Sequence, residues 1–198
     1  MGKQERLDDY RTKRNLRRSG EPVGKATAAS EGKPRFVVQR HDASTLHFDL
    51  RLEINGVLVS WSVPKGPSTD PSKKRLAVRT EDHPMAYAEF EGKIGEGEYG
   101  AGTVVVWDTG TFRNLSEHDG DSTDLAEALH RGHLAVWLEG EKLSGGYALT
   151  RTTLHGGDDE WLLVKMKDEG ADRRRKPAKT QPESVLSGRT NEDLDGDD

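Results

Sequence analysis

The chain has 198 residues, no cysteine and a formal net charge of -5 at pH 7. The lack of cysteine excludes disulfides and thiolate zinc sites, and the acidic balance means that any contact with nucleic acid must come from local basic patches. No apolar run is long enough to span a membrane and the N-terminus lacks the apolar stretch of a signal peptide, so we expect a cytoplasmic protein with no membrane partner.

Residues 1–34 are predicted to be a basic arm followed by a linker. Seven Lys or Arg residues stand against three acidic residues in positions 1–20, and residues 23–34 are rich in Gly, Ala and Ser. Such an arm is either solvated and disordered or lies along a phosphate backbone, and both readings stay open.

Short strands and turns dominate residues 35–168, which we predict to form one domain. The apolar residues are concentrated there, and Asn55-Gly56 is a strong hairpin signal because both positions tolerate a positive φ. The predicted strands, the fifth and sixth of which form a hairpin, are Arg35–Arg40, His47–Ile54, Val57–Val63, Arg75–Thr80, Thr103–Trp107, Gly110–Asn114, His133–Glu139, Gly146–Thr153 and Glu160–Lys167.

The remaining segments are loops, one helix and a tail. Residues 92–102 are glycine-rich and predict a structural turn, and Asp124–His130 predicts a short helix capped by Ser122 or Thr123. Residues 169–198 have no apolar period and are predicted to be a disordered, charged tail. Many short strands with one helix and flexible termini indicate a mainly β fold, an antiparallel barrel or a sandwich.

A candidate metal site lies on one predicted strand. Apolar and polar residues alternate strictly from Leu46 to Ile54, so His47, Asp49 and Arg51 share the polar face. Neighbours on one face are roughly 7 Å apart, close enough for His47 and Asp49 to share an ion, and His41 could complete the set. Two imidazoles and a carboxylate suit divalent manganese, zinc or iron.

Basic residues and a further histidine are candidates for phosphate contacts. Lys65 and Arg75 flank loops that could return to the same end of a barrel as Arg51. Clustered cations beside a metal are what phosphoryl chemistry needs, because negative charge develops on phosphate oxygens. His83 precedes a proline, which favours an extended backbone and makes it a candidate proton donor or phosphate contact.

The sequence resembles the 3′-phosphoesterase domain of bacterial DNA ligase D and its free-standing relatives. The similarity covers roughly residues 10–168 and comprises several uninterrupted blocks in one order. These blocks are Arg40-His41-Asp42-Ala43, Leu46-His47-Phe48-Asp49-Leu50-Arg51-Leu52-Glu53, Ser60-Trp61-Ser62-Val63-Pro64-Lys65-Gly66-Pro67-Ser68, Lys74-Arg75-Leu76-Ala77-Val78, Glu81-Asp82-His83-Pro84, Tyr99-Gly100-Ala101-Gly102 and Trp107-Asp108-Thr109-Gly110.

The resemblance implies a compact β-barrel with an open groove and a metal-dependent hydrolase, typically using manganese. Its substrates would be DNA or RNA-terminated primer-template 3′ ends, from which it removes a terminal ribonucleoside and then the 3′-phosphate in end-joining repair. Ku and a DNA ligase or polymerase would be its partners. The implied metal ligands are His41, His47 and Asp49; the implied phosphate-binding and catalytic residues are Arg51, Lys65, Arg75, Glu81, His83 and Tyr87, with Gln39 nearby, and Arg14 and Glu21 of the arm.

One departure and two alternatives accompany this hypothesis. The family usually follows the arm arginine with an aspartate and an aromatic residue, whereas this chain has Asn15 and Leu16, which bears on the nucleoside-removing step. Two histidines and a carboxylate on a β-barrel also describe non-haem iron oxygenases. The third reading is a module that binds a 3′ end without turnover.

Overall fold

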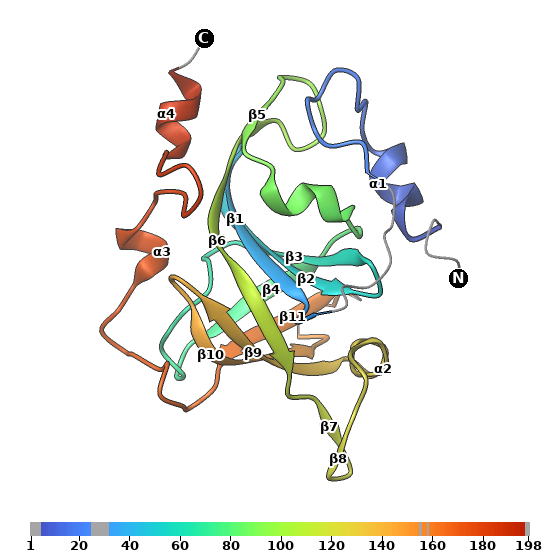
Figure 1. Cartoon of the computed structure of the whole chain (residues 1–198), viewed down its shortest axis with the longest axis vertical. Coiled ribbons are helices and arrows are strands. Elements are labelled where there is room, and N and C mark those ends of the chain that lie inside the picture. Colours follow the sequence, from blue (N-terminus) through green and yellow to red (C-terminus); the bar gives the residue numbers. More distant parts are fainter. Residues whose placement is uncertain (1–4, 25–31, 155, 158, 197–198) are drawn as a thin grey trace.

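The computed structural model describes residues 5–24, 32–154, 156–157 and 159–196. Eight antiparallel strands close into a barrel in the order β1-β2-β3-β4-β11-β10-β9-β6, and β6 pairs back with β1 (Figure 1). A ninth strand, β5, extends the sheet beside β6. The strands are β1 (Arg35–Asp42), β2 (Leu46–Ile54), β3 (Val57–Val63), β4 (Lys74–Arg79), β5 (Gly92–Ile94), β6 (Gly102–Asn114), β9 (His133–Gly140), β10 (Ser144–Arg151) and β11 (Glu160–Lys165), with β7 (Glu117–His118) and β8 (Asp121–Ser122) forming a separate small hairpin.

The predicted mainly β barrel is confirmed, and so is its first hairpin. Asn55 and Gly56 connect β2 to β3 with φ angles of 55° and 80°. Positive φ at both central residues gives the turn a twist that matches the twist of the flanking strands. This turn fixes the register of β2 and β3, so that Asp49 lies opposite Ser62 and Arg51 opposite Ser60.

The predicted hairpin within residues 103–114 is wrong, because β6 is one continuous strand of 13 residues. Its pairing with β1 shifts where Val38 faces Asp108 and Gln39 faces Val106, so Trp107 is an extra residue on β6. Such a bulge bends a strand without ending it. The buried Asp108 carboxylate accepts hydrogen bonds from the backbone N–H groups of Thr109, Glu141, Lys142 and Leu143, so this residue of the expected turn holds a neighbouring loop.

The predicted helix forms as α2 (Leu125–Arg131), but its cap is Asp124. The Asp124 carboxylate accepts from the backbone N–H groups of Ala126 and Glu127. The chain has more short helices than the single one that we expected, because these elements carry too few residues for a helical period to be visible. They are η1 (Glu5–Leu7), α1 (Asp8–Thr12), η2 (Met85–Glu89), α3 (Pro177–Thr180) and α4 (Asn191–Asp195).

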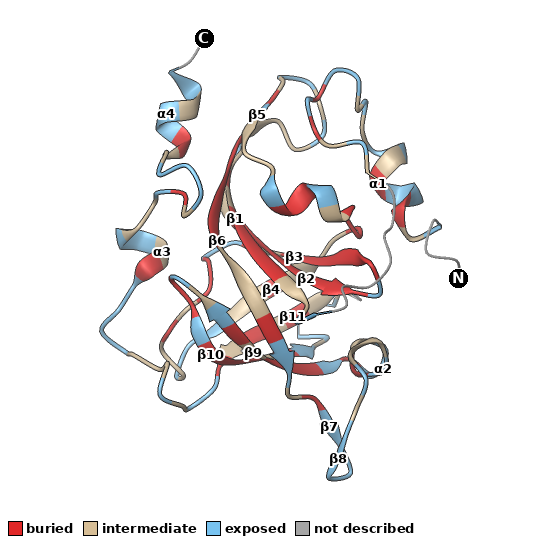
Figure 2. Cartoon of the chain, in the orientation of Figure 1, coloured by how far each residue is buried: buried red, intermediate tan, exposed pale blue. Residues whose placement is uncertain are grey.

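Apolar side chains pack on both faces of the β1–β3 sheet. The barrel interior holds the larger cluster, which includes Phe48, Trp61 and Trp161. A second cluster, including Tyr10 of α1 and Tyr87 of η2, lies on the outer face against Val37, Leu58 and Val106. The outer face of β1–β3 is therefore covered by the arm and by η2, and these strands are buried along most of their length (Figure 2).

The tail differs from the prediction, since residues 169–196 lie along the barrel rather than being disordered (Figure 1). Trp107 Nε1 donates to Gln181 O at 2.6 Å, and the Val185 N–H donates to Val106 O at 3.0 Å. Asn191 is fully buried and donates to Thr103 O at 2.7 Å and Arg40 O at 3.2 Å. These are polar and backbone contacts, which leave no apolar period in a sequence.

Part of the predicted linker, residues 25–31, and both chain ends, residues 1–4 and 197–198, lie outside the described residues. Among the described residues, no helix is long and apolar enough to cross a membrane.

The Asn191→Ala substitution should release α4 from the barrel. It leaves two buried carbonyl groups without their donor, which costs about 1–3 kcal/mol. Hydrogen exchange of the backbone amides in α4 should become about tenfold faster or more, while amides of β2 and β3 should keep their rates. Glu192→Ala, an exposed change on the same helix, is the control; equal exchange in both variants would contradict the anchoring role.

Candidate active site

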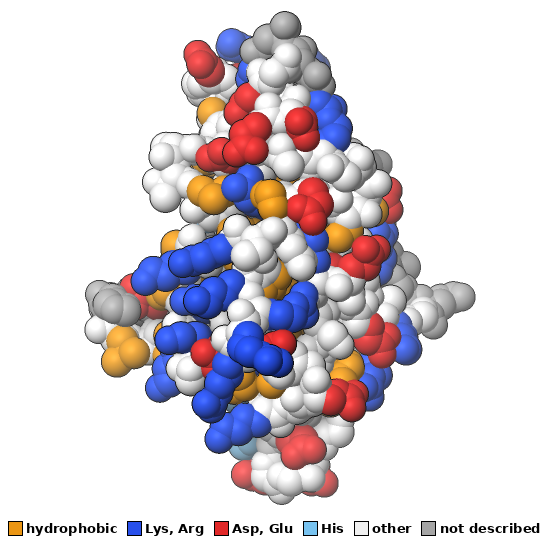
Figure 3. Space-filling view, turned by 90° about the vertical axis from the view of Figure 1, so that its left-hand side faces the viewer, with side chains coloured by type: hydrophobic (Ala, Val, Ile, Leu, Met, Phe, Trp, Pro, Cys, Tyr) orange, Lys and Arg blue, Asp and Glu red, His pale blue; other side chains and the backbone are white. Residues whose placement is uncertain are grey.

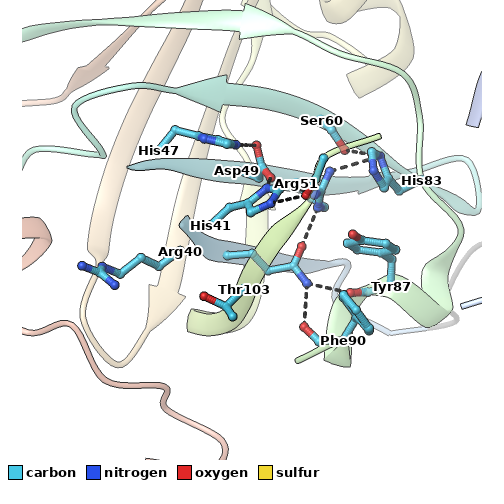
Figure 4. Close-up of polar contacts among 12 residues, drawn as sticks. Arg40, His41, His47, Asp49, Arg51, Ser60, His83, Tyr87, Phe90 and Thr103 are labelled. Atoms are coloured by element: carbon cyan, nitrogen blue, oxygen red, sulfur yellow. Dashed lines mark hydrogen bonds and ion pairs between the residues drawn. The ribbon is translucent and has the colours of Figure 1, made fainter. Parts of the chain in front are cut away.

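The pairing of β1 with β2 brings the three predicted metal ligands together. His41 lies directly opposite His47, and Asp49 follows two residues later on the same face of β2. His41 Nδ1 and His47 Nε2 each lie 3.6 Å from a carboxylate oxygen of Asp49, and the ligand atoms all lie within 4.8 Å of one another (Figure 4). The outer face of the barrel thus presents two imidazole nitrogens and one carboxylate to a single point.

Backbone carbonyls determine which nitrogen of each imidazole faces that point. His41 Nε2 lies 2.8 Å from Gly100 O, and His47 Nδ1 lies 2.9 Å from Thr45 O. A carbonyl can only accept, so these two nitrogens carry the hydrogen. In the neutral imidazoles the opposite nitrogens then direct lone pairs at the Asp49 carboxylate. Three converging lone pairs fit a divalent cation, and histidine ligands oriented by a carbonyl are typical of metal sites.

Asp49 is held in its ionised form. Burial alone would raise the pKa of its carboxyl group, but the Arg51 guanidinium, together with the imidazoles when they are protonated, outweighs burial and lowers the pKa to about 2. The carboxylate is therefore available as a metal ligand at any physiological pH.

Arg51 is fixed by partners on three sides. It donates to Gln39 Oε1 at 2.7 Å and to Asp49 Oδ2 at 3.1 Å, and its guanidinium lies 4.8 Å from the centre of the Tyr87 ring. Gln39 in turn donates to the backbone carbonyls of Tyr87 and Phe90 (Figure 4). A buried charge held in this way needs little reorganisation to meet an anion.

His83 is buried and neutral. Burial lowers its pKa well below 6.5, and the guanidinium groups of Arg51 and Arg14 lower it further. Its Nδ1 lies 2.9 Å from Glu81 O and 3.1 Å from Arg51 Nη1, and its Nε2 lies 3.2 Å from Arg14 Nη2. The predicted role of proton donor would therefore require a bound anion that makes the charged imidazole more favourable.

The N-terminal arm contributes two residues to the same site. Arg14 pairs with Glu21 at 2.8 Å and with Glu81 at 2.6 Å, and the Tyr87 hydroxyl donates to Glu21 at 2.9 Å. Burial would raise the pKa of Glu81, but Arg14 more than offsets this and lowers it. The second oxygen of Glu21, Oε2, is buried and has no hydrogen-bond partner among the described residues.

These groups line a cavity of about 310 Å³. Its charged lining comprises two guanidiniums, from Arg14 and Arg51, and three carboxylates, from Glu21, Asp49 and Glu81. This balance alone would repel a phosphate, whereas one added divalent cation would make the cavity attractive to it. The predicted convergence of His41, His47 and Asp49 beside an arginine is observed, but the cavity is positive only with a cation.

Two predicted site residues do not line this cavity. Lys65 is exposed in the turn after β3. Arg75 lies on β4 opposite the buried Leu163, which places its side chain on the inner face of the sheet, and its buried Nε has no partner among the described residues. The structure therefore does not bring these two cations to Arg51, and their roles stay predictions.

The sequence analysis missed the part played by the glycine-rich loop. Gly100 supplies the carbonyl that orients His41, and Tyr99 is half exposed at the cavity, with the guanidinium of Arg14 5.0 Å from its ring centre. The loop is more than a structural turn. The only sequence signal for this role was a single tyrosine, Tyr99, among glycines. Arg14 and Lys13, which lie over its ring, come from a distant segment of the chain.

Comparison with known proteins gives one family match and several curated relatives. The sequence profile of the DNA ligase D 3′-phosphoesterase domain matches residues 39–151. The chain is 51% identical over 187 residues to the multifunctional non-homologous end joining protein LigD of Pseudomonas aeruginosa, covering 93% of this chain and 21% of that protein. It is 42% identical over 165 residues to the LigD proteins of Mycobacterium tuberculosis and Mycolicibacterium smegmatis, covering 83% of this chain and 20% and 21% of those proteins. The chain thus spans about a fifth of the length of these relatives.

Manganese binding should depend on the three converging ligands. Titration calorimetry with Mn²⁺ should give one site in the wild type, and His41→Ala, His47→Ala or Asp49→Ala should each weaken it about tenfold or more. His133→Ala is the matched control, because His133 is exposed and contacts Thr150. Equal Mn²⁺ affinity in the control and the ligand variants would rule out this site.

The Glu81–Arg14 pair should make stability depend on acid pH. Because the folded pKa of Glu81 lies below its ordinary value of 4.5, the unfolded chain binds the proton first, and stability is lost as the pH falls from about 4.5 through the folded pKa. The free energy of unfolding should therefore fall less steeply in Glu81→Gln than in the wild type over that range. The control Glu117→Gln, at an exposed position, should show the wild-type slope. If Glu81→Gln also showed the wild-type slope, the assignment to Glu81 would be refuted.

Proposed function

Because the chain belongs to the DNA ligase D 3′-phosphoesterase domain family, we propose that it is a metal-dependent 3′-phosphoesterase that heals nucleic-acid 3′ ends. The observation that carries this proposal is the convergence of His41, His47 and Asp49 beside the buried guanidinium of Arg51. A role in end-joining repair follows from the relatives, whose printed names place them in non-homologous end joining. Cooperation with Ku and a ligase or polymerase is part of the same proposal.

The site supports each requirement of phosphoester hydrolysis. A bound divalent ion, manganese first among the candidates, would supply Lewis-acid polarisation of a phosphate oxygen. Arg51 would hold another oxygen of the phosphate, and its contacts with Gln39 and Asp49 keep it in place before the substrate arrives. Neutral His83 would contact the phosphate, where the negative charge would favour its protonation.

The arm residues support a role at the sugar. Glu21 Oε2 is a buried acceptor without a donor among the described residues, and a ribose hydroxyl is a donor of the kind that it needs. Arg14 fixes Glu21 and also reaches His83, so the arm couples this acceptor to the phosphate site. Asn15 lies in the turn that follows α1 and is exposed, so the family's aspartate would also stand outside the buried network here.

The arginines favour this function over the iron-oxygenase alternative. Two guanidiniums reach the cavity beside the candidate ligands, and guanidinium groups recognise phosphate oxygens by paired hydrogen bonds. They fit a phosphate better than they fit a dioxygen pocket, because dioxygen carries no charge.

A primer-template with a 3′-phosphate and Mn²⁺ tests the proposal directly. The wild type should convert the end to a 3′-hydroxyl, measured by gel mobility and by extension with a polymerase, and a chelator should abolish the conversion. His47→Ala and Arg51→Ala should each slow it about a hundredfold or more, while His133→Ala keeps the wild-type rate.

The same variants on a primer with one 3′-terminal ribonucleotide separate the two steps. Tight binding without any product from either end would establish an end-binding module instead. Oxygen consumption with ferrous iron and a keto acid, in place of phosphate release, would establish the oxygenase.

A further inference from the structure

Basic side chains gather on one face of the molecule, away from the cavity. Figure 3 shows this face, on which Lys and Arg side chains form a band. All eight residues in the following set are exposed, and they come from the turn after β3, the start of β4, the end of β11 and the tail. We call this set the basic face: Lys65, Lys73, Lys74, Lys167, Arg173, Arg174, Lys176 and Lys179.

Tertiary hydrogen bonds hold the segments of the basic face together. Thr69 donates from its hydroxyl to Asp172 O at 2.8 Å and to Arg175 O at 3.1 Å, and accepts at its own carbonyl from the Asp172 N–H at 2.9 Å. Arg175 donates to Lys142 O at 3.0 Å, which ties the tail to the loop between β9 and β10. The basic run of the tail is thereby placed beside the lysines that precede β4.

The positive charge of the basic face is left largely uncompensated. Within the described part of the chain, none of its lysines forms an ion pair, and its two arginines make only long contacts of 3.8 Å to Asp70 and Asp172. The side chains of Arg173 and Arg174 are 73% and 95% exposed, so these contacts stabilise little. Nearby Asp168 is already paired with the buried Lys165 at 2.6 Å. Gathering eight like charges in a chain of net charge -5 opposes folding, which points to an anionic partner.

The basic face meets β2 on the side opposite to the candidate metal ligands. Gly66 packs closely against both the Phe48 ring and Ala178, since a Cβ at Gly66 would lie 2.9 Å from atoms of each. Phe48 stands between His47 and Asp49 on β2, and Ala178 belongs to α3, between Lys176 and Lys179. The turn that carries Lys65 therefore joins the basic face to the strand that carries two candidate metal ligands.

We propose that the basic face binds the phosphate backbone of the duplex whose 3′ end enters the cavity. This inference rests on the proposed function and extends it from the terminal phosphate to the duplex behind it. The composition of the face favours nucleic acid over an acidic protein, because protein interfaces need an apolar centre whereas DNA interfaces are polar and positive. Of the large hydrophobic residues that are exposed in the described chain, only Met166 and Leu186 belong to the segments of this face, and they do not make an apolar centre.

Duplex binding with a triple variant tests the proposal. Lys73→Ala, Lys167→Ala and Arg174→Ala together remove one cation from each of three segments and none from the cavity. The matched control, Lys33→Ala, Arg113→Ala and Arg131→Ala, removes the same charge from exposed positions that pair with Glu139 or Glu127. The probe is a fluorescent 24-base-pair duplex with a 3′-hydroxyl, followed by anisotropy over a series of salt concentrations, and thermal unfolding confirms that both variants fold.

Each lost phosphate contact lowers the salt dependence of log Kd by about 0.9, so the slope should fall by about 2 to 3 and the affinity about tenfold or more in the triple variant. The control should bind as the wild type does. Equal duplex binding by the triple and control variants would overturn the proposal, and so would competition by polyglutamate as strong as by unlabelled duplex, which would assign the face to an acidic protein.

A second substrate separates this proposal from the function on which it rests. A trinucleotide with a 3′-phosphate has only two backbone phosphates behind the terminal one and offers the basic face little to bind, so the triple variant should hydrolyse it at the wild-type rate. If neither the wild type nor the variants hydrolyse the trinucleotide, and only the triple variant loses duplex binding, the phosphoesterase assignment fails and the proposed binding surface stands. If hydrolysis of the trinucleotide is normal and duplex binding is equal, only the surface fails.

Discussion

The structure depends on one electrostatic constraint, the meeting of three lone-pair donors on the outer face of a barrel. The β1–β2 register places His41 opposite His47, and the carbonyls of Gly100 and Thr45 hold each ring so that its free nitrogen faces Asp49. When both rings are neutral these groups repel one another, and a divalent cation between them would remove that repulsion.

The arm and η2 bury this face, and burial strengthens the electrostatic interactions within the site. A strand pair with a solvated outer face would leave its charges screened by water, whereas here the arm and η2 pack a second apolar cluster beside the site. Asp49, Arg51 and His83 are consequently buried, and each one is held by a hydrogen bond to a neighbour in the network. Burial and the two arginines together hold His83 neutral, whereas at Asp49 the Arg51 guanidinium opposes the effect of burial and favours the ionised carboxylate.

The tail, like the site, is held in place by contacts between segments that lie far apart in the sequence. It carries too few apolar residues to fold by itself, and its placement relies on partners that the barrel provides, such as Val106 for the backbone of Val185 and Thr103 for Asn191. Those partners lie on β6, whose bulge at Trp107 bends the strand where the tail crosses it. The segment that we expected to form a hairpin is thus part of the surface that the tail contacts.

The sequence by itself determined the strand pattern, the Asn55-Gly56 hairpin and the set of His47, Asp49 and Arg51 on one face, because a period of two and a two-residue turn are local properties of the chain. Only the tertiary structure decided which distant groups join that set. It brought Arg14, Tyr99 and Gly100 to the cavity, left Lys65 and Arg75 outside its lining, and laid the tail on the barrel. Those outcomes depend on strand closure and on side chain to backbone hydrogen bonds between segments far apart, and neither leaves a periodic signal in a single sequence.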